Sequence, residues 1–164
     1  MSIDTTRIRP PVPDDLEELV GLCADHAAYE RADYDPEGKA GDLARLVLGA
    51  EPRIHCLVAA DGSRLAGYAT WTYDASTWDA REFAYLDCLY LTAAYRGQGL
   101  GRELLRGVAR AAHRHGCVQV QWHTPDFNRD AIRFYARIGA GSKSKVRFFL
   151  EGDALHRLIS NEGS

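Results

Sequence analysis

The sequence predicts one α/β (α+β) domain whose elements follow the order β-α-α-β-β-β-α-β-α-β. Its 164 residues, 46% hydrophobic and 26% charged, are enough to bury a core and have a globular composition. The spacing of apolar residues alternates between helical and strand periods, without an internal repeat or a linker. A glycine-rich stretch also stands between a strand pattern and a helix pattern. We therefore expect residues 1–164 to form a single domain with its core at about 5–150.

The first third of the chain predicts one strand and two helices. Residues 5–9 form a short strand that ends at Pro10 and Pro11. A helix starts at Pro13, and its apolar residues recur on one face. The acidic, tyrosine-rich stretch 29–37 is typical of a solvated loop, and a second short helix follows at about 40–48.

The middle of the chain predicts an antiparallel meander. The helical spacing of apolar residues ends at Arg53, and residues 54–60 and 64–73 are expected to form two strands joined by the turn residues Asp61-Gly62-Ser63. Residues 82–91 form a third long strand, reached through a loop that contains Trp78.

The last part predicts two helices and two strands. A helix begins at about residue 102 and is capped by Gly116, and residues 117–123 alternate as a strand. Asn128 caps a further helix that stops at Gly139, and residues 145–150 are expected to form the final strand.

Charge is divided unevenly along the chain. Residues 1–50 carry 11 acidic and 5 basic side chains, whereas residues 88–164 carry 12 basic and 6 acidic ones. The acidic part suits a cationic substrate and the basic part suits phosphate. Nucleic acid is a poor fit, because the net charge is −3. No apolar run has the length of a signal h-region or membrane span, so we expect a soluble cytoplasmic protein.

The four cysteines predict neither a metal site nor a disulfide framework. They lie far apart, with no Cys-x-x-Cys and no histidine at ligand spacing beside them. We expect them to be small buried hydrophobic residues and expect no metal.

Arg96-Gly97-Gln98-Gly99-Leu100-Gly101 is a candidate pyrophosphate cradle. Glycines let backbone N–H groups approach an anion that the following helix N-terminus also attracts. A Walker loop is excluded, because Arg102 and Glu103 follow where Lys-Ser/Thr is required. A dinucleotide fingerprint is disfavoured, because the loop lies past mid-chain and residues 117–123 hold no acid.

The same six residues match the Arg/Gln-x-x-Gly-x-Gly/Ala signature, so the chain resembles the GNAT N-acetyltransferase superfamily from about residue 5 to 150. The resemblance implies the GNAT fold, a mixed, mostly antiparallel central sheet flanked by helices. It also implies acetyl-CoA as the cosubstrate. Residues 28–30, Tyr73-Asp74, 85–87 and 132–140 are similar to the diamine (spermidine/spermine) and thialysine N-acetyltransferase branch.

The resemblance also implies roles for individual residues. Asp87 corresponds to the acid that holds the attacking amine or its proton-accepting water, and an acid among the apolar residues of a strand is itself unusual. Tyr135 corresponds to the tyrosine that protonates the departing thiolate, although a core aromatic beside Phe134 is the structural alternative. The implied acetyl-CoA contacts are Leu89, Tyr90, Leu91, Arg96, Gly97, Gln98, Gly99, Leu100, Gly101, Arg102 and Asn128. Tyr29, Glu30, Trp78 and Asp87 would bind the amine.

Several alternatives stay open. His123 is the reserve candidate for the base, and Cys88 and Arg129 stand where the diamine branch has acids, which disfavours a long polyamine. The acceptor is then a small diamine or a thialysine-like amino acid, with an aminoglycoside-like compound, a protein amine or a non-catalytic acyl-CoA sensor as rivals. A homodimer is implied by the resemblance alone.

Overall fold

The computed structural model describes residues 6–160, and the chain divides into two compact units, Met1–Pro125 and Asp126–Ser164. The first unit contains five strands and the helices that cover them. The second contains two helices. Thr5, with which the expected first strand begins, lies outside the described residues.

The first unit is built on a mixed sheet with the strand order β1-β2-β3-β4-β5. Its strands are β1 (Thr6–Arg9), β2 (His55–Asp61), β3 (Arg64–Ser76), β4 (Arg81–Leu91) and β5 (Val120–Gln121). The first three pairings are antiparallel, and only β4 and β5 run parallel. The predicted meander is confirmed. The strand expected over 117–123 is shorter than predicted and comprises only the two residues of β5.

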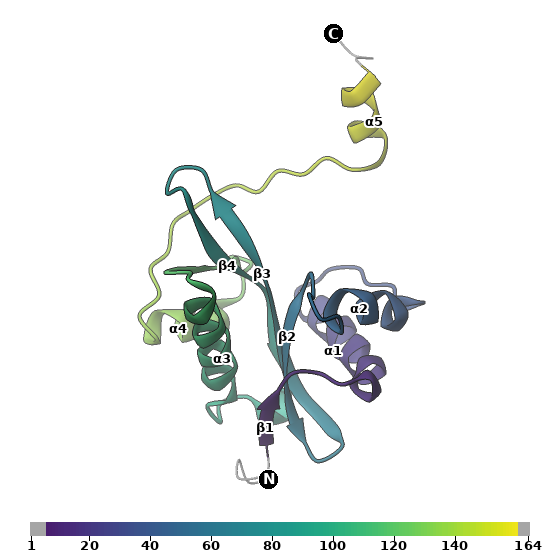
Figure 1. Ribbon diagram of the computed structural model, residues 1–164, viewed down its shortest axis with the longest axis vertical. Helices are drawn as coiled ribbons and strands as arrows, with labels where there is room; N and C mark the ends of the chain where they lie inside the picture. The colour runs from purple at the N-terminus through teal and green to yellow at the C-terminus, as the bar shows by residue number, and fades with distance from the viewer. Residues whose placement is uncertain (1–5, 161–164) are drawn as a thin grey trace. The chain divides into compact units, whose positions relative to one another are not determined.

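Helices cover both faces of this sheet (Figure 1). One face carries the short 3-10 turn Pro13–Asp15, α1 (Leu16–Tyr29) and α2 (Lys39–Val47), and the other carries α3 (Leu100–His115). Leu19 of α1 and Tyr68 of β3 are each 1% exposed in the core on the first face. On the second face, Leu104 and Val108 of α3 are fully buried. The sequence periodicity predicted these apolar faces.

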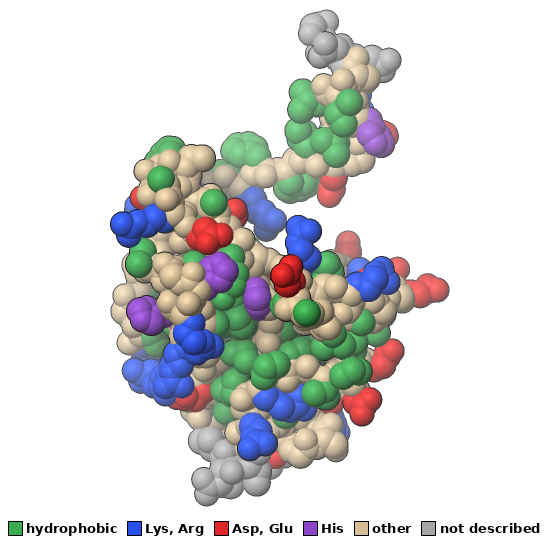
Figure 2. Space-filling view, viewed as in Figure 1, with side chains coloured by type: hydrophobic (Ala, Val, Ile, Leu, Met, Phe, Trp, Pro, Cys, Tyr) green, Lys and Arg blue, Asp and Glu red, His purple; other side chains and the backbone are tan. Residues whose placement is uncertain are grey.

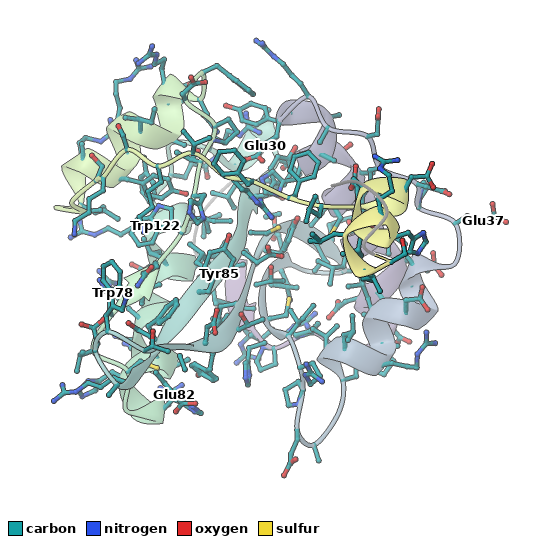
Figure 3. All side chains as sticks on the ribbon, turned by 90° about the horizontal axis from the view of Figure 1, so that it is seen from above. Glu30, Glu37, Trp78, Glu82, Tyr85 and Trp122 are labelled. Atoms are coloured by element: carbon teal, nitrogen blue, oxygen red, sulfur yellow. The ribbon has the colours of Figure 1, made fainter. Side chains whose placement is uncertain are left out.

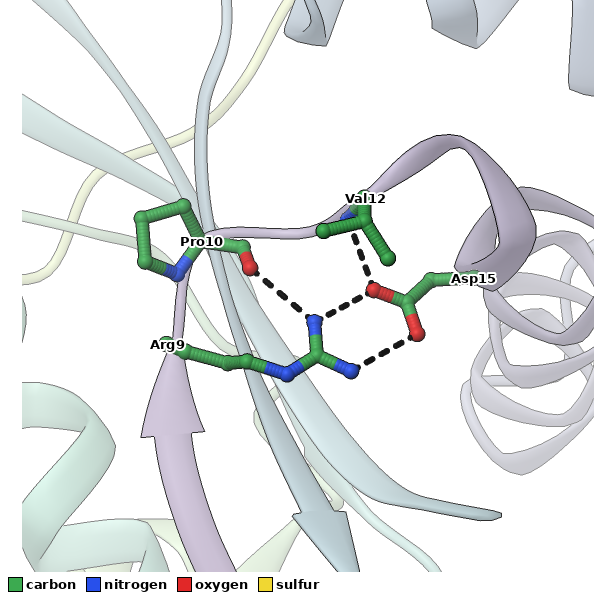
Figure 4. Close-up of polar contacts among 4 residues, drawn as sticks. All are labelled: Arg9, Pro10, Val12 and Asp15. Atoms are coloured by element: carbon green, nitrogen blue, oxygen red, sulfur yellow. Dashed lines mark hydrogen bonds and ion pairs between the residues drawn. The ribbon is translucent and has the colours of Figure 1, made fainter. Parts of the chain in front are cut away.

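An ion pair fixes the corner between β1 and the first helical turn (Figure 4). Arg9 Nη1 lies 2.5 Å from Asp15 Oδ2, Arg9 Nη2 donates to Asp15 Oδ1 at 2.9 Å, and the Val12 N–H donates to Asp15 Oδ2 at 2.7 Å. Asp15 is 9% exposed. The hydrogen bond from Arg9 holds the pKa of the Asp15 carboxyl below its ordinary value. The pair thereby sets the direction in which α1 leaves the sheet edge.

The second unit contains α4 (Arg129–Arg137) and α5 (Gly152–Ser160). Asn128 caps α4 as predicted, because its Oδ1 accepts the Ala131 N–H at 3.2 Å. The strand expected over residues 145–150 is wrong: this segment has no strand partner within residues 6–160, and α5 follows it. Val146 and Phe148 are 79% and 89% exposed. A short segment rich in apolar residues is typical of a strand, but a strand forms only when a neighbouring strand accepts its hydrogen bonds.

Over residues 6–160, every helix is too short or too polar to cross a membrane.

Candidate functional site

Strand β4 is bulged at Asp87. Thr70 of β3 pairs with Cys88, but the next residue, Trp71, pairs with Leu86, so Asp87 is the extra residue on β4. A β-bulge leaves one residue outside the ladder and redirects its side chain. Asp87 is exposed, and its charge acts on Cys23 and His26 of α1. The bulge therefore turns this carboxylate toward the sheet face that α1 covers.

The edge of β4 beyond the bulge is unpaired by any described strand. β5 pairs only with Ala84 and Tyr85, so the two parallel strands separate before Asp87. The Thr92 N–H donates to Ala66 O of the neighbouring chain segment at 2.9 Å. Since backbone polar groups alternate in direction along a strand, those of Tyr90 point toward β3, and those of Leu89 and Leu91 point to the open edge.

This geometry distinguishes the three β4 residues that are expected to contact the pantetheine arm of acetyl-CoA. Leu89 and Leu91 can accept an added strand-like ligand, whereas the backbone of Tyr90 is directed into the existing ladder. The Leu91 carbonyl already accepts a hydrogen bond from Arg96 Nε at 2.9 Å.

The glycine-rich loop leads from this open edge to the N-terminus of α3. Gly97 and Gly99 have φ values of +75° and +86°, a region that favours glycine, and Gly99 is the N-cap residue. A Cβ at either position would meet nothing within 4 Å, and no side chain caps this helix end. The loop therefore presents an open helix N-terminus, and its residues fit a pyrophosphate group.

The flanking residues of the loop are also in place. Gln98 Nε2 donates to the Ala94 carbonyl at 2.8 Å, Leu100 is buried, and Arg102 lies exposed in the first turn of α3 beside Gly101. Figure 2 shows basic side chains gathered over α3 and acidic ones over the side of α1 and α2. The charge division seen in the sequence thus becomes a division between the two faces of the sheet.

Aromatic and charged side chains gather where the C-terminal end of α1 meets β3 and β4. The His26 ring stacks on Tyr90 with centroids 5.1 Å apart, and the Arg96 guanidinium lies over the rings of Tyr29 and Tyr90, at 4.5 and 5.4 Å. Glu30 follows Tyr29 at the end of α1 (Figure 3). The structure thus brings together Tyr29, Glu30 and Arg96. Asp87 belongs to the surroundings of this cluster, because its charge acts on His26.

Beneath this cluster the sheet carries buried hydroxyl and thiol groups. Tyr68 OH lies 3.0 Å from His26 Nδ1, and burial raises its pKa above the ordinary value. Burial also raises the pKa of Cys88 to about 12, so this thiol stays protonated, and its Sγ donates to Asp87 Oδ2 at 3.7 Å. These thiols are poor nucleophiles, which favours direct transfer over a cysteine-bound intermediate.

Trp78 lies apart from this cluster. It is 97% exposed in the turn between β3 and β4, on the order of 20 Å from Asp87 along the strand. Figure 3 places it well away from Glu30. Its assignment to the amine pocket stays a prediction, without support from the geometry of this unit.

His123 follows β5 and contacts β4. Its Nδ1 lies 3.1 Å from Tyr85 OH, and Tyr85 precedes Asp87 by two residues. His123 therefore stays the reserve candidate for the base.

Tyr135 and Asn128 belong to the second unit. The Tyr135 ring is half-buried on α4, with its centroid 5.2 Å from that of Phe134. The Asn128 side chain caps the same helix. The roles of Tyr135 in protonation and of Asn128 in cofactor contact stay predictions.

Sequence reasoning missed His26 and Tyr68. His26 precedes Glu30 by four residues, a spacing that places both on one helix face and could have paired them. Tyr68 offers no such local signal, because it meets His26 only through the packing of α1 on β3. Among residues 6–160, no group of three or more His, Cys, Asp or Glu side chains could hold a metal ion.

A sheet that opens beside a bulged acid, with a glycine loop and a helix N-terminus at the end of the opening, is the architecture of an acyl-CoA-dependent transferase. Residues 16–140 match the Acetyltransferase (GNAT) family, and the chain belongs to this family. It is a GNAT N-acetyltransferase, and members of this family use acetyl-CoA.

Individual relatives point the same way. The chain is 30% identical over 166 residues to thialysine N-epsilon-acetyltransferase of Mus musculus, covering 94% of this chain and 97% of that protein. That relative belongs to the branch that the sequence motifs indicated. An integron cassette protein of V. cholerae shares the fold with a TM-score of 0.79 at 24% identity, over 94% of this chain and 98% of that one. An aminoglycoside N-acetyltransferase solved in complex with CoA has a TM-score of 0.74 at 17% identity, over 89% and 94%.

Proposed function

We propose that this protein transfers the acetyl group of acetyl-CoA to the side-chain amine of a small amino acid of the thialysine type, by direct attack. The observation that carries the proposal is the open edge of β4. It begins at the bulged Asp87 and ends at the glycine loop, so one continuous path joins an acid to an anion cradle. The match over residues 16–140 spans both compact units, which supports a single functional domain.

Asp87 would activate the amine. A primary amine has a pKa near ~10.4, so its reactive form costs about 4 to 5 kcal/mol at neutral pH unless a base takes the proton. Asp87, directly or through a water molecule, holds the ammonium and accepts that proton. The amine nitrogen bonds to the acetyl carbonyl carbon as the carbon–sulfur bond breaks, and Tyr135 gives its proton to the departing thiolate. The nitrogen loses its second excess proton as the amide forms, and this proton restores the Tyr135 hydroxyl, while the first leaves Asp87 for the solvent.

The side chains of Tyr29, Glu30, Tyr90 and Arg96, together with His26, form what we call the acceptor cluster. The charges around it favour an amino acid over a diamine as the acetyl acceptor. Glu30 and Asp87 suit an ammonium group. Arg96 begins the loop whose backbone N–H groups would hold pyrophosphate, and its guanidinium, which lies over Tyr29 and Tyr90, suits a carboxylate. Cys88 supplies no charge where the diamine branch has a second acid, because its thiol is protonated. A diamine would leave Arg96 facing a second cation.

The test is thiol release from acetyl-CoA with a matched acceptor panel. It contains thialysine, lysine and ornithine, their decarboxylated diamines, spermidine and an aminoglycoside. We expect kcat/KM for the amino acids to exceed that of their diamines by at least about tenfold, which is one charge-assisted contact. A higher kcat/KM for the aminoglycoside than for the amino acids would assign the protein to aminoglycoside-like acceptors instead. Acetyl-CoA binding without turnover on any amine would favour a non-catalytic sensor.

We also propose a homodimer. The family resemblance supports it, and the second unit exposes several large apolar side chains, which are typical of an association surface. These are Val146, Phe148, Phe149, Leu150, Leu158 and Ile159. Light scattering would contradict this proposal by giving a monomer mass near 18.2 kDa.

A further inference from the structure

Tyr68, His26 and Glu30 form a series of polar contacts where α1 packs on β3. Tyr68 OH of β3 lies 3.0 Å from His26 Nδ1, and His26 Nε2 lies 3.4 Å from Glu30 Oε1. The His26 and Glu30 side chains are 14% and 34% exposed, whereas Tyr68 is 1% exposed. The series therefore runs from the buried sheet to a partly exposed carboxylate just after α1.

The donors in this series can be assigned. The Tyr68 hydroxyl keeps its proton, because burial raises its pKa. If it donates to Nδ1, the imidazole carries its proton on Nε2 and donates to Glu30. The opposite tautomer would turn an unprotonated Nε2 toward a carboxylate, which places two acceptors face to face. With Nε2 protonated, each proton in the series faces an acceptor: Nδ1 for the Tyr68 hydroxyl, and Glu30 Oε1 for the Nε2–H.

The surroundings of His26 oppose a positive charge on the ring. Burial lowers its pKa below 6.5, and Arg96 acts in the same direction, while Glu30 and Asp87 act against it. The titratable or charged groups around His26 are Cys23 from α1, Glu30 just after α1, Tyr68 from β3, Asp87 and Tyr90 from β4, and Arg96 from the loop after β4. At neutral pH the His26 ring is therefore uncharged, and its Nε2–H faces the Glu30 carboxylate.

We propose that His26 is a positioning residue for the acceptor: in its Nε2–H tautomer, fixed by the Tyr68 hydroxyl, it holds the Glu30 carboxylate in place for the ammonium group. This inference rests on the proposed function and adds the mechanism of acceptor selection. The buried Tyr68 hydroxyl orients the imidazole through Nδ1, and Nε2 then acts on the Glu30 carboxylate.

Protonation of His26 would weaken acceptor binding in two ways. A proton on Nδ1 faces the Tyr68 O–H, so two donors meet, and the ring adds a positive charge next to Arg96 and the ammonium site. The KM for the acceptor therefore rises as the pH falls through the pKa of His26, which lies below its ordinary value. The acceptor amine itself stays protonated over this range, so its own titration does not contribute.

The first test is nitrogen NMR of the histidine rings in the full-length protein without substrate. We expect the His26 ring to show a protonated Nε2 and an unprotonated Nδ1 at pH 7.5, and His26→Gln assigns its signals. A proton on Nδ1, or a doubly protonated ring at this pH, would overturn the inference. Because no acceptor is present, this readout does not depend on the proposed reaction.

The second test is the separation of KM from kcat. His26→Phe removes the donor, and we expect the acceptor KM to rise about tenfold at pH 7.5, with kcat and the KM for acetyl-CoA within about twofold. His26→Gln keeps an N–H near the Nε2 position without a titration. We expect this variant to retain the acceptor KM within about threefold at pH 7.5 and to lose the rise of KM at acidic pH.

His113→Gln is the matched control, because His113 lies exposed near the end of α3, on the other face of the sheet. It should follow the wild-type pH profile. An unchanged acceptor KM in His26→Phe, or a pH-dependent KM in His26→Gln, would contradict the positioning role. Absence of turnover with every small amine would overturn the proposed function instead, while the nitrogen signals would still decide the tautomer.

Discussion

Replacing Asp87 by Asn removes the proposed base and changes little else. The carboxylate is exposed, and its contact with the Cys88 thiol at 3.7 Å is a weak hydrogen bond. We therefore expect the free energy of unfolding to change by less than about 0.5 kcal/mol. The catalytic effect should be much larger, because a general base contributes about 10²- to 10⁴-fold.

The pH dependence makes this prediction specific. Near pH 7.4 about one amine in a thousand is unprotonated when its pKa is near ~10.4. Without the base, Asp87→Asn must use this fraction, so its kcat/KM should rise about tenfold for each pH unit up to pH 9.5. The wild-type protein should show a shallower rise.

Thiol release measured between pH 7 and 9.5, at saturating acetyl-CoA, provides the assay. Asp42→Asn is a suitable control, because Asp42 is an exposed acid on α2 that pairs with Arg45. A kcat/KM in Asp87→Asn within threefold of wild type at pH 7.4 would refute the reasoning, and the same assay on His123→Gln would then test the reserve base.

Four further outcomes are expected. Tyr135→Phe should lower kcat by about 10- to 100-fold with normal acetyl-CoA affinity, measured by thiol release and calorimetry, and an unchanged kcat would exclude it as the proton donor. Gly99→Ala should cost about 1–2 kcal/mol because φ is +86°, and it should weaken acetyl-CoA binding; Gly62→Ala, with φ +62° in the β2–β3 turn, should lose stability alone. Asp15→Asn should lower the free energy of unfolding in urea by about 1.5–3 kcal/mol, since it removes a charge-assisted pair with Arg9; a loss below 0.5 kcal/mol would contradict this. The pKa of His26 is lowered in the folded state, so the unfolded chain binds more protons below pH 6.5 and the melting temperature should fall from pH 7.5 to 5.5, less steeply in His26→Gln.

Local patterns in the sequence predicted most of the fold. The apolar face of α3, the Asp61-Gly62-Ser63 turn and the Asn128 cap each depend on neighbouring residues, and the structure contains all three. The strand expected at residues 145–150 failed for the opposite reason. The segment is rich in apolar residues, but whether a strand forms depends on a partner that the sequence pattern cannot supply.

The candidate site was predicted in its parts but not in its geometry. The glycine loop and Asp87 follow from a motif and from an acid among apolar residues. The bulge that turns Asp87 out of the ladder, and the burial of Tyr68 against His26, arise from the packing of distant elements. No periodicity along one segment records such contacts. The same reason explains why the alternation of backbone direction at Leu89 and Tyr90 emerged only with the structure.

The proposed reaction requires acetyl-CoA to lie along the open edge of β4, and we expect its pantetheine arm to extend the sheet there. Amide hydrogen exchange at residues 89–91, with and without acetyl-CoA, tests it most directly. Because the Tyr90 N–H points toward β3, it should exchange slowly in both states, whereas the Leu89 N–H should exchange rapidly in the free protein and slowly when acetyl-CoA is bound. Exchange at Leu89 that stays rapid under saturating acetyl-CoA would contradict the claim.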